Sequence, residues 1–374
     1  MTRPSVLIAA FSARQIARSA QLAGYDALAV DFFNDLDLGQ YCAVSALLTG
    51  HYPDGFDAQA LLDTLEKLAL GREPLGFVYG AGFEDRPDLL DAIGQRWPIL
   101  GNCANTVRQL KDPAAFALLC RQAGIAHPPT ALAPPRPATG WLAKKMGGSG
   151  GSHIVPAETV KDANGYYFQP ILPGEKISLG LIGMGRHISP LGLTRQWNQP
   201  IAEAPYRYGG ALGPLNLPQE NELVAAVAAI AQSMPLLGLC SADFLITEGQ
   251  PPVLLEINPR AGATLDVFEN AEYPLFQRHM AAFHGKGTAF PAPIGPRRAS
   301  GLLWAEQPII VPQNFMWPEW AADLPRPGAG IASGEPVCTI VAEATGADCD
   351  ERQLYQLFTE RQVTLLAALQ RSAA

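Results

Sequence analysis

Polar side chains occupy every second position after a short apolar run at residues 253–260, which read VLLEINPR. In a β-strand, Glu256, Asn258 and Arg260 would share one face with Leu254, because successive side chains point to opposite sides. Carboxylate and carboxamide oxygens suit Mg²⁺ or Mn²⁺, and so few protein ligands leave room for substrate phosphates. The spacing therefore indicates a cation site beside a fixed guanidinium.

A second carboxylate comes from the preceding apolar run, SADFLIT at 241–247, which the linker EGQPP separates from VLLEINPR. If the hairpin is centred between Gly249 and Gln250, Asp243 lies directly opposite Glu256. Two facing carboxylates repel each other unless a cation lies between them. A register shifted by one residue would place the acids on opposite faces, so the predicted metal site depends on this pairing. The alternative is a solvated hairpin face.

A glycine-rich loop follows Lys144 in the segment LAKKMGGSGGS, residues 142–152. Glycines let the backbone approach phosphates and offer N–H groups, and the lysine supplies positive charge. The loop is not a P-loop, because no GK[ST] follows the glycines. Alone it fits a flexible linker equally well; with the downstream acids it supports a nucleotide-site hypothesis.

Strand and helix patterns alternate through the first hundred residues. Apolar runs at 5–11, 26–33, 75–80 and 98–102 alternate with helical patterns at 12–25, 57–70 and 86–97. This order predicts a parallel sheet with helices on its faces. The turn after the first run, FSARQIA, has no glycine, which argues against a nicotinamide or flavin site even though Asp31 ends the second run.

The remaining chain is predicted to be mixed. A helix pair is expected within 106–130, a Pro-rich connector at 132–140, strands over 165–193, a helix at about 218–233 and a final helix at about 350–370. No internal repeat is present.

Composition limits the classes of function. The 374 residues include 35 acidic and 27 basic side chains, a net charge of −8, which argues against a nucleic-acid partner. The most apolar stretch, 223–240, is broken by Gln232, Ser233 and Pro235, so we expect a helix and a strand and no membrane partner. The six cysteines form no CxxC pair, and the first apolar run is too short for a signal peptide. We therefore expect free, buried thiols and a cytoplasmic protein.

The order of these motifs resembles the ATP-grasp superfamily over roughly residues 1–285. The resemblance is carried by TVRQLKD, LAKKMGGSGG, the apolar hinge YYFQPILPGE, the acid of SADF, and LEINPR, the most specific of the five. It implies an α/β and α+β fold. The expected parts are a Rossmann-like N-terminal domain at 1–105, an ATP-grasp lid at 106–170, a C-terminal ATP-grasp subdomain with the metal hairpin at 171–290, and a small C-terminal extension at 291–374.

The resemblance also implies roles for individual residues. ATP phosphates would contact Lys111, Lys144 and the loop residues Gly148, Ser149 and Gly150. The adenine hinge would be Gln169, Pro170, Ile171 and Leu172, with Glu175 a candidate for ribose or substrate. One or two Mg²⁺ or Mn²⁺ ions would bind Asp243, Glu256 and Asn258, while Arg260 and Lys144 would act on the transferred phosphate. Three positions depart from the family pattern: Lys145 replaces a proline, Gln169 a hinge acid, and Asp243 a glutamate.

The implied reaction is ATP-dependent joining of a small-molecule carboxylate and an amine through an acyl phosphate. Arg260 suits both the incoming carboxylate and the acyl phosphate. The alternatives are a bicarbonate-phosphorylating enzyme of the biotin-carboxylase or carbamoyl-phosphate type, and a non-catalytic nucleotide-binding regulator. Further candidates are Glu84 for substrate, His153 for phosphate, and, for an acceptor pocket, Arg195, Tyr206, Arg207 and Tyr208.

The segments VYGAGFED and WPEW…RPGAGI…GEPVCTI are similar to poorly characterised ligases of archaea and one-carbon-metabolising bacteria, with a tyramine–glutamate ligase among their relatives. This similarity implies cofactor biosynthesis, an amino acid such as glutamate as a substrate, and possible homo-oligomers.

Overall fold

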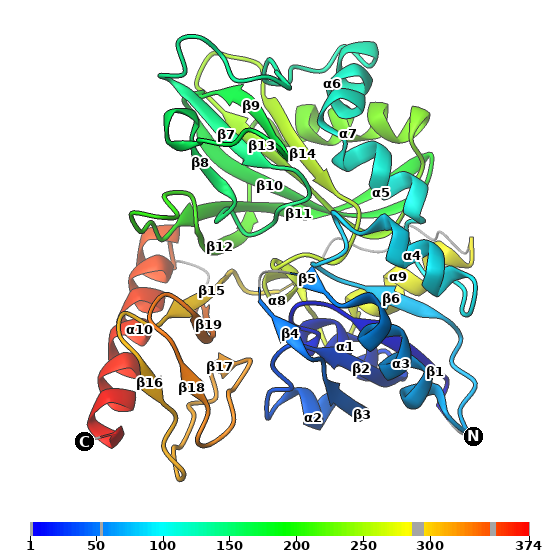
Figure 1. Cartoon of the computed structure of the whole chain (residues 1–374), viewed down its shortest axis with the longest axis vertical. Coiled ribbons are helices and arrows are strands. Elements are labelled where there is room, and N and C mark those ends of the chain that lie inside the picture. The colour runs from blue at the N-terminus through cyan, green and yellow to red at the C-terminus, as the bar shows by residue number, and fades with distance from the viewer. Residues whose placement is uncertain (1–2, 53–54, 286–294, 345–348, 374) are drawn as a thin grey trace.

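The computed structural model describes residues 3–52, 55–285, 295–344 and 349–373. It begins with a four-stranded parallel sheet in the order β3-β2-β1-β6 (Figure 1). Its strands are β1 (Ser5–Ala9), β2 (Asp26–Asp31), β3 (Cys42–Leu47) and β6 (Phe77–Tyr79), and its helices are α1 (Arg14–Leu22), α2 (Leu38–Tyr41), α3 (Ala58–Ala69) and α4 (Pro87–Gly94). A small hairpin, β4 (Gly50–His51) with β5 (Gly55–Phe56), lies between β3 and α3.

The predicted parallel sheet is present, but one of its strands was predicted wrongly. Residues 98–102 form no strand, since only Ile99 makes an isolated bridge, to Phe77. The fourth strand is β3, whose burial is intermediate and whose sequence CAVSAL lacks a continuous apolar run.

The middle of the chain forms a small lid-like sheet next to two helices. Its antiparallel strands are β8 (Ile154–Pro156), β7 (Trp141–Lys145) and β9 (Tyr166–Pro170), in that order, and the helices are α5 (Ala104–Lys111) and α6 (Pro113–Gln122). Asp112 caps α6 by accepting the N–H of Ala115 at 2.7 Å. The small sheet has a core of its own around Ala143 and Phe168.

A larger antiparallel sheet of eight strands forms the rest of the core, in the order β14-β13-β10-β11-β12-β15-β19-β17. The strands are β10 (Glu175–Gly185), β11 (His187–Asn198), β12 (Tyr208–Leu215), β13 (Leu236–Ile246), β14 (Val253–Asn258), β15 (Arg298–Trp304), β17 (Ala321–Ala322) and β19 (Pro336–Glu343). Helix α7 (Glu220–Ser233) packs on it, while α8 (Leu265–Phe268) and α9 (Leu275–Phe283) lie between it and the N-terminal sheet.

One apolar core joins the two sheets. Val6 and Ile8 of β1, Leu239 of β13, and Phe268 and Phe276 of α8 and α9 belong to the same buried cluster. Burial of this apolar surface fixes the parallel sheet against the large one. Side chains after β1 and β2 therefore face the hairpin β13–β14 across a defined space.

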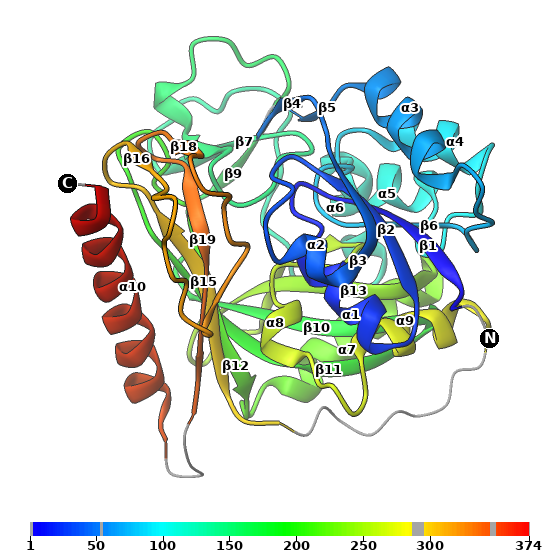
Figure 2. The same ribbon diagram turned by 90° about the horizontal axis from the view of Figure 1, so that it is seen from below.

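The C-terminal residues complete the large sheet. Strands β15, β19 and β17 extend it beyond β12, β16 (Ile309–Ile310) pairs with β18 (Gly330–Ile331), and α10 (Glu351–Ala373) packs on β15 and β19. Figure 2 shows α10 on the outer side of these strands, with the N-terminal sheet on the other. The boundary predicted between residues 290 and 291 lies outside the described residues.

Two further sequence expectations can be compared with the structure. None of the helices in the described ranges is long and apolar enough to cross a membrane. All six cysteines are free thiols, but only Cys120, Cys240 and Cys338 are buried; Cys103 is exposed, so the expectation of general burial was wrong.

Candidate functional site

The hairpin β13–β14 has the register on which the predicted metal site depends. Asp243 pairs with Glu256, and Ser241 pairs with Asn258. The next pair along is Phe244 with Leu254, so Leu255 is an extra, unpaired residue that forms a β-bulge.

The bulge corrects the expected alternation of β14. Leu254 does not share the face of Glu256: it is buried in the core of the large sheet together with Phe244 and Ile257. Leu255 and Glu256 both line a cavity between the hairpin, the N-terminal sheet and the C-terminal segment. The bulge thus places the Glu256 carboxylate at the cavity and keeps Leu254 and Ile257 in the core.

Lys111, from the end of α5, lies between the predicted metal ligands. Its Nζ is 2.8 Å from Oε2 of Glu256 and 2.7 Å from Oδ1 of Asn258. Burial alone would raise the pKa of Glu256, but the Lys111 ammonium, aided by His153 and Lys144, holds that pKa well below its ordinary value. The ammonium therefore occupies the position of a cation between these oxygens.

Asp243 completes the polar face of the hairpin. Its carboxylate accepts hydrogen bonds from Nδ2 of Asn258 at 3.2 Å and Nε2 of Gln196 at 3.3 Å. Burial, together with the facing Glu256 carboxylate, raises the pKa of Asp243 to about 6. No group of three His, Cys, Asp or Glu side chains within the described ranges has metal-binding geometry. A divalent ion here would thus have two carboxylates and one carboxamide as protein ligands, which leaves coordination positions for phosphate oxygens.

Two more lysines face this hairpin. Lys144 is the penultimate residue of β7 and is buried, and burial lowers its pKa although Glu256 opposes the shift. Lys176 of β10, which the sequence analysis missed, donates to Oδ1 of Asn198 at 2.9 Å and lies over the Tyr206 ring. Lys176 could have been recognised from the sequence because it follows Glu175 in a strand. Side chains alternate between the two faces of a strand, so Lys176 lies on the opposite face from Glu175. With Lys111, these side chains give the site three cations suited to a polyphosphate.

The glycine loop closes over the cavity where it meets the start of β12. Ser149, Gly150 and Gly151 line the cavity, whereas Gly148 does not. Gly151 has a φ of +75°, and a Cβ there would lie 2.0 Å from the carbonyl oxygen of Tyr206. Only glycine fits this approach. His153, also at the cavity, contacts the Ser149 carbonyl through Nδ1 at 3.2 Å.

Arg260 lines the cavity and forms a buried ion pair with Glu84. Its Nε and one terminal nitrogen both donate to Oε1 of Glu84, at 2.8 and 2.6 Å. Glu84 also accepts the N–H of Gly82 at 2.7 Å. Burial disfavours the charged carboxylate, yet the nearby Arg260 lowers the pKa of Glu84. Glu84 itself does not line the cavity; it holds the guanidinium in place.

The predicted adenine hinge lies outside the large cavity. Gln169, Pro170, Ile171, Leu172 and Glu175 are all absent from its lining. Gln169 is buried, and its Nε2 donates to Oγ1 of Thr130 at 3.0 Å, but its Oε1 has no partner among the described residues. Glu175 is exposed and paired with Arg195 at 2.5 Å. The free acceptor on Gln169 is the one feature of the hinge that fits an amino group of a base.

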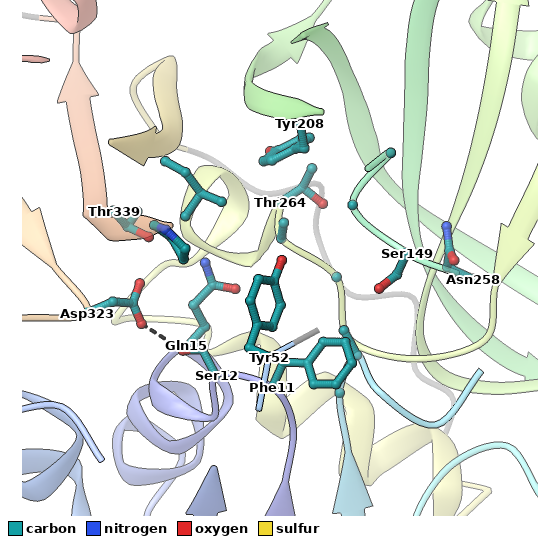
Figure 3. A pocket seen from close by; sticks show the side chains of 18 of the residues that line it. Phe11, Ser12, Gln15, Tyr52, Ser149, Tyr208, Asn258, Thr264, Asp323 and Thr339 are labelled. Atoms are coloured by element: carbon teal, nitrogen blue, oxygen red, sulfur yellow. Dashed lines mark hydrogen bonds between the residues drawn. The ribbon is translucent and has the colours of Figure 1, made fainter. Parts of the chain in front are cut away.

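A single cavity of about 710 Å³ joins the hairpin to the N-terminal sheet and the C-terminal segment. Figure 3 shows Phe11, Gln15 and Tyr52 in the middle, with Ser149 and Asn258 on one side and Asp323 and Thr339 on the other. Tyr208 OH is buried at its wall without a partner among the described residues. Unpaired buried polar atoms favour a polar ligand.

The residues expected at an acceptor pocket divide into two pairs. Tyr206 and Tyr208 line the cavity, but Arg195 and Arg207 do not. Arg207 stacks on the Trp304 ring at 4.2 Å and donates to the carbonyl oxygen of Gln199. Arg207 therefore supports the cavity wall at Trp304 without lining the cavity itself.

The architecture and the hairpin define an ATP-grasp fold, a class that comparisons with known proteins also indicate. Residues 116–264 match the model for an ATP-grasp domain. An uncharacterized protein from Methanocaldococcus jannaschii is 31% identical over 140 residues, which cover 36% of this chain and 34% of that protein. The match therefore spans about a third of this curated relative.

Solved structures of similar fold cover nearly the whole chain. Biotin carboxylase from Campylobacter jejuni has a TM-score of 0.70 at 13% identity, covering 95% of this chain and 90% of that one. N5-carboxyaminoimidazole ribonucleotide synthetase from Thermus thermophilus has a TM-score of 0.66 at 18% identity, covering 97% and 98%. The biotin carboxylase domain of the Hydrogenobacter thermophilus 2-oxoglutarate carboxylase, solved with MgADP and bicarbonate, has a TM-score of 0.70 at 12% identity, covering 98% and 90%. At these identities the likeness shows the fold alone.

Proposed function

We propose that this protein is an ADP-forming ligase that joins a carboxylate to an amine. The observation that carries the proposal is that Asp243, Glu256, Asn258, Arg260, Lys144 and Lys176 all line one cavity. Lys111 does not line it but contacts Glu256 and Asn258 directly. Phosphoryl transfer needs positioned cations more than covalent chemistry. The fixed Arg260 distinguishes this site from one that only binds nucleotide.

The residues divide the chemical work as follows. Lys144, Lys176 and the N–H groups of the glycine loop bind the phosphates. Asp243, Glu256 and Asn258 would hold a divalent cation, which would neutralise phosphate charge. A carboxylate oxygen of the substrate attacks the γ-phosphorus, and the bond from phosphorus to the ADP oxygen breaks. The amine nitrogen then attacks the acyl carbon, phosphate leaves, and the amine loses a proton. Arg260 orients first the carboxylate and then the acyl phosphate.

Lys111 would share its oxygens with the incoming cation. Its ammonium is within 3 Å of both Glu256 and Asn258, so a divalent cation held by these oxygens would leave Lys111 available to the phosphates. The family resemblance implies the same phosphate-contacting role for Lys111.

Bicarbonate phosphorylation is the second candidate, and the fold favours it. The similar structures include two biotin carboxylases, one of them solved with bicarbonate, and N5-carboxyaminoimidazole ribonucleotide synthetase. In this reaction bicarbonate replaces the organic carboxylate at Arg260.

ADP release from Mg-ATP separates the candidates. The ligase should release ADP only when a carboxylate and an amine are both present, with mass spectrometry showing a product lighter than the sum of the two by one water. A glutamate-containing panel is the first choice. ADP release with bicarbonate alone would replace the ligase with the second candidate, and no release under any pairing would leave a nucleotide-binding regulator.

A further inference from the structure

Part of the cavity, called the arm below, is lined by Phe11, Phe33, Tyr52, Asp323 and Asp35 rather than by the metal hairpin. Asp35 follows β2, is only 5% exposed, and lines the cavity. Within the part of the chain that the structure describes, no side chain or backbone group forms a hydrogen bond or ion pair with its carboxylate. A buried carboxylate without a partner is costly, so the position favours a ligand that supplies positive charge.

The surroundings of Asp35 are rich in acids. Asp31, Asp37 and Asp323 lie near enough to disfavour its charge, and Arg14 is the cation that opposes them. Arg14 is already engaged, since it pairs with Asp266 and with Asp323 at 2.7 Å each. Burial, then the charge of Asp323, raises the pKa of Asp35 well above its ordinary value. Asp35 therefore holds its proton more readily than an ordinary carboxyl group, and a bound ammonium group would offset the repulsion from the neighbouring acids.

The acids that surround Asp35 are held by the backbone. Asp31 accepts the N–H groups of Ala13 and Asn34, and Asp37 accepts those of Asp323 and Leu324, at 2.7–2.9 Å. Asp35 is the member of this group that faces the cavity without such a bond. It is the carboxylate available to a ligand.

The backbone around Asp35 is itself strained. Asn34 and Asp323, which have φ of 45° and 54°, are the non-glycine residues with left-handed φ in the described ranges. Both adjoin this arm: Asn34 precedes Asp35, and Asp323 lines the opposite wall. Strained residues of this kind persist where neighbouring contacts hold them, and they cluster at ligand sites.

The side walls of the arm are aromatic. Phe11 and Phe33 each contact Tyr52, with ring centroids 5.3 and 5.9 Å apart, and all three rings line the cavity. Phe11 and Phe33 lie just after the carboxyl ends of β1 and β2, where open parallel sheets bind ligands. Aromatic faces attract both apolar groups and cations.

We propose that this arm is a subsite for the ammonium group of an amine with a compact apolar or aromatic body, bound at Asp35. That the amine is the acceptor of the ligase reaction rests on the proposed function; its binding does not. A divalent metal fits less well, because the neighbouring carboxylates of Asp31 and Asp37 already accept backbone N–H groups. Arg326, an exposed cation that also lines the arm and donates to the carbonyl oxygen of Asn34, opposes binding.

Calorimetric titration of the full chain without nucleotide tests the subsite through the charge of the probe. Benzylamine should bind at least tenfold more tightly than benzyl alcohol, and benzoate should not bind, because a hydrogen bond to a charged partner is stronger than a neutral one. Asp35→Asn should abolish this preference for the amine, while Glu73→Gln, which removes an exposed acid of the same domain, should not change it. Arg326→Gln should strengthen amine binding severalfold.

The outcomes separate the subsite from the proposed reaction. Glu256→Gln should leave benzylamine binding unchanged, whatever it does to ADP release. Equal binding of amine and alcohol, an amine preference that survives Asp35→Asn, or competition of Mg²⁺ or Ca²⁺ with benzylamine at Asp35 would each overturn the ammonium subsite. Since Asp35→Asn removes an unpaired buried charge, we expect its thermal midpoint to be no lower than that of the wild type, so the variant remains testable.

Discussion

Lys111 and Glu256 form an ion pair of 2.8 Å between the end of α5 and the bulged strand β14, across 145 residues of sequence. The ammonium lies where the proposed reaction needs a divalent ion. Lys111 and a divalent ion would therefore compete for the oxygens of Glu256 and Asn258.

Replacing Glu256 tests the metal assignment directly. Glu256→Gln keeps the size of the side chain but removes the negative charge that Lys111 and a divalent ion share. We expect Mg-dependent ADP release to fall at least about a hundredfold, as for other groups that stabilise transition-state charge. The matched control is Glu248→Gln, an exposed acid in the turn of the same hairpin, which should have no effect. Unchanged Mg-dependent turnover in Glu256→Gln would remove this residue from the site.

Asp243 should lower the stability of the folded protein in a pH-dependent way, although the proposed reaction needs its carboxylate. Its pKa in the folded protein is about 6, above the ordinary 3.8, so ionised Asp243 lowers the free energy of unfolding at and above pH 6. Asp243→Asn removes that penalty. We expect the variant without Mg²⁺ to be more stable than the wild type by about 1–3 kcal/mol at pH 7.5. The gain should shrink as pH falls below 6 and vanish near pH 4.

Urea denaturation at several pH values measures this effect, and ADP release measures its functional cost. Asp243→Asn should lose turnover while it gains stability. Added Mg-ATP should protect the wild type more than the variant, because only the wild type has both carboxylates. A stability difference that does not change with pH would contradict the assigned titration.

Variants of Arg260 and Glu84 can distinguish a structural role of Arg260 from a role in the reaction. Arg260→Met leaves Glu84 buried without its partner, so we expect a loss of about 3–5 kcal/mol in the free energy of unfolding. Adding Glu84→Gln should recover part of that loss, because the unpaired charge is gone. Turnover should stay low in the double variant if Arg260 acts on substrate. Recovery of turnover together with stability would make Arg260 only a structural partner of Glu84.

Arg14 connects three parts of the chain, and its removal should be costly. It pairs with Asp266 of α8 and with Asp323 of the C-terminal segment, and all three side chains are largely buried. We expect Arg14→Met to lower the free energy of unfolding by about 3–5 kcal/mol in denaturant titration. Arg18→Met is the control, since Arg18 is 40% exposed and 3.9 Å from Asp266, and should cost less than about 1 kcal/mol. Equal losses in the two variants would contradict a special role for the buried cluster.

The sequence predicted the parts of this protein that depend on local order. The alternating strands and helices of the first domain, the pairing of Asp243 with Glu256, and the glycine loop facing that pair all follow from short-range pattern and chain connection. Strand β3 escaped prediction because it is half-buried and lacks an apolar run.

Contacts between distant segments were beyond the sequence. Glu84 meets Arg260 across 176 residues, and Arg14 meets Asp323 across 309. Both pairs depend on how α8, α9 and the C-terminal strands pack on the first domain, which no local pattern records. The sequence indicates the aromatic wall only through Phe11 and Phe33, the rings that follow β1 and β2.

The bulge at Leu255 also determines where this hairpin can vary in length. On the turn side of the bulge, residues 248–252 connect the strands without touching the cavity, so insertions there would leave Asp243 and Glu256 paired. Within β14, deletion of Leu255 would force a choice between Leu254 in the core and Glu256 at the cavity. Homologous chains should therefore differ in the size of the turn and agree in the number of residues between the core leucine and the carboxylate.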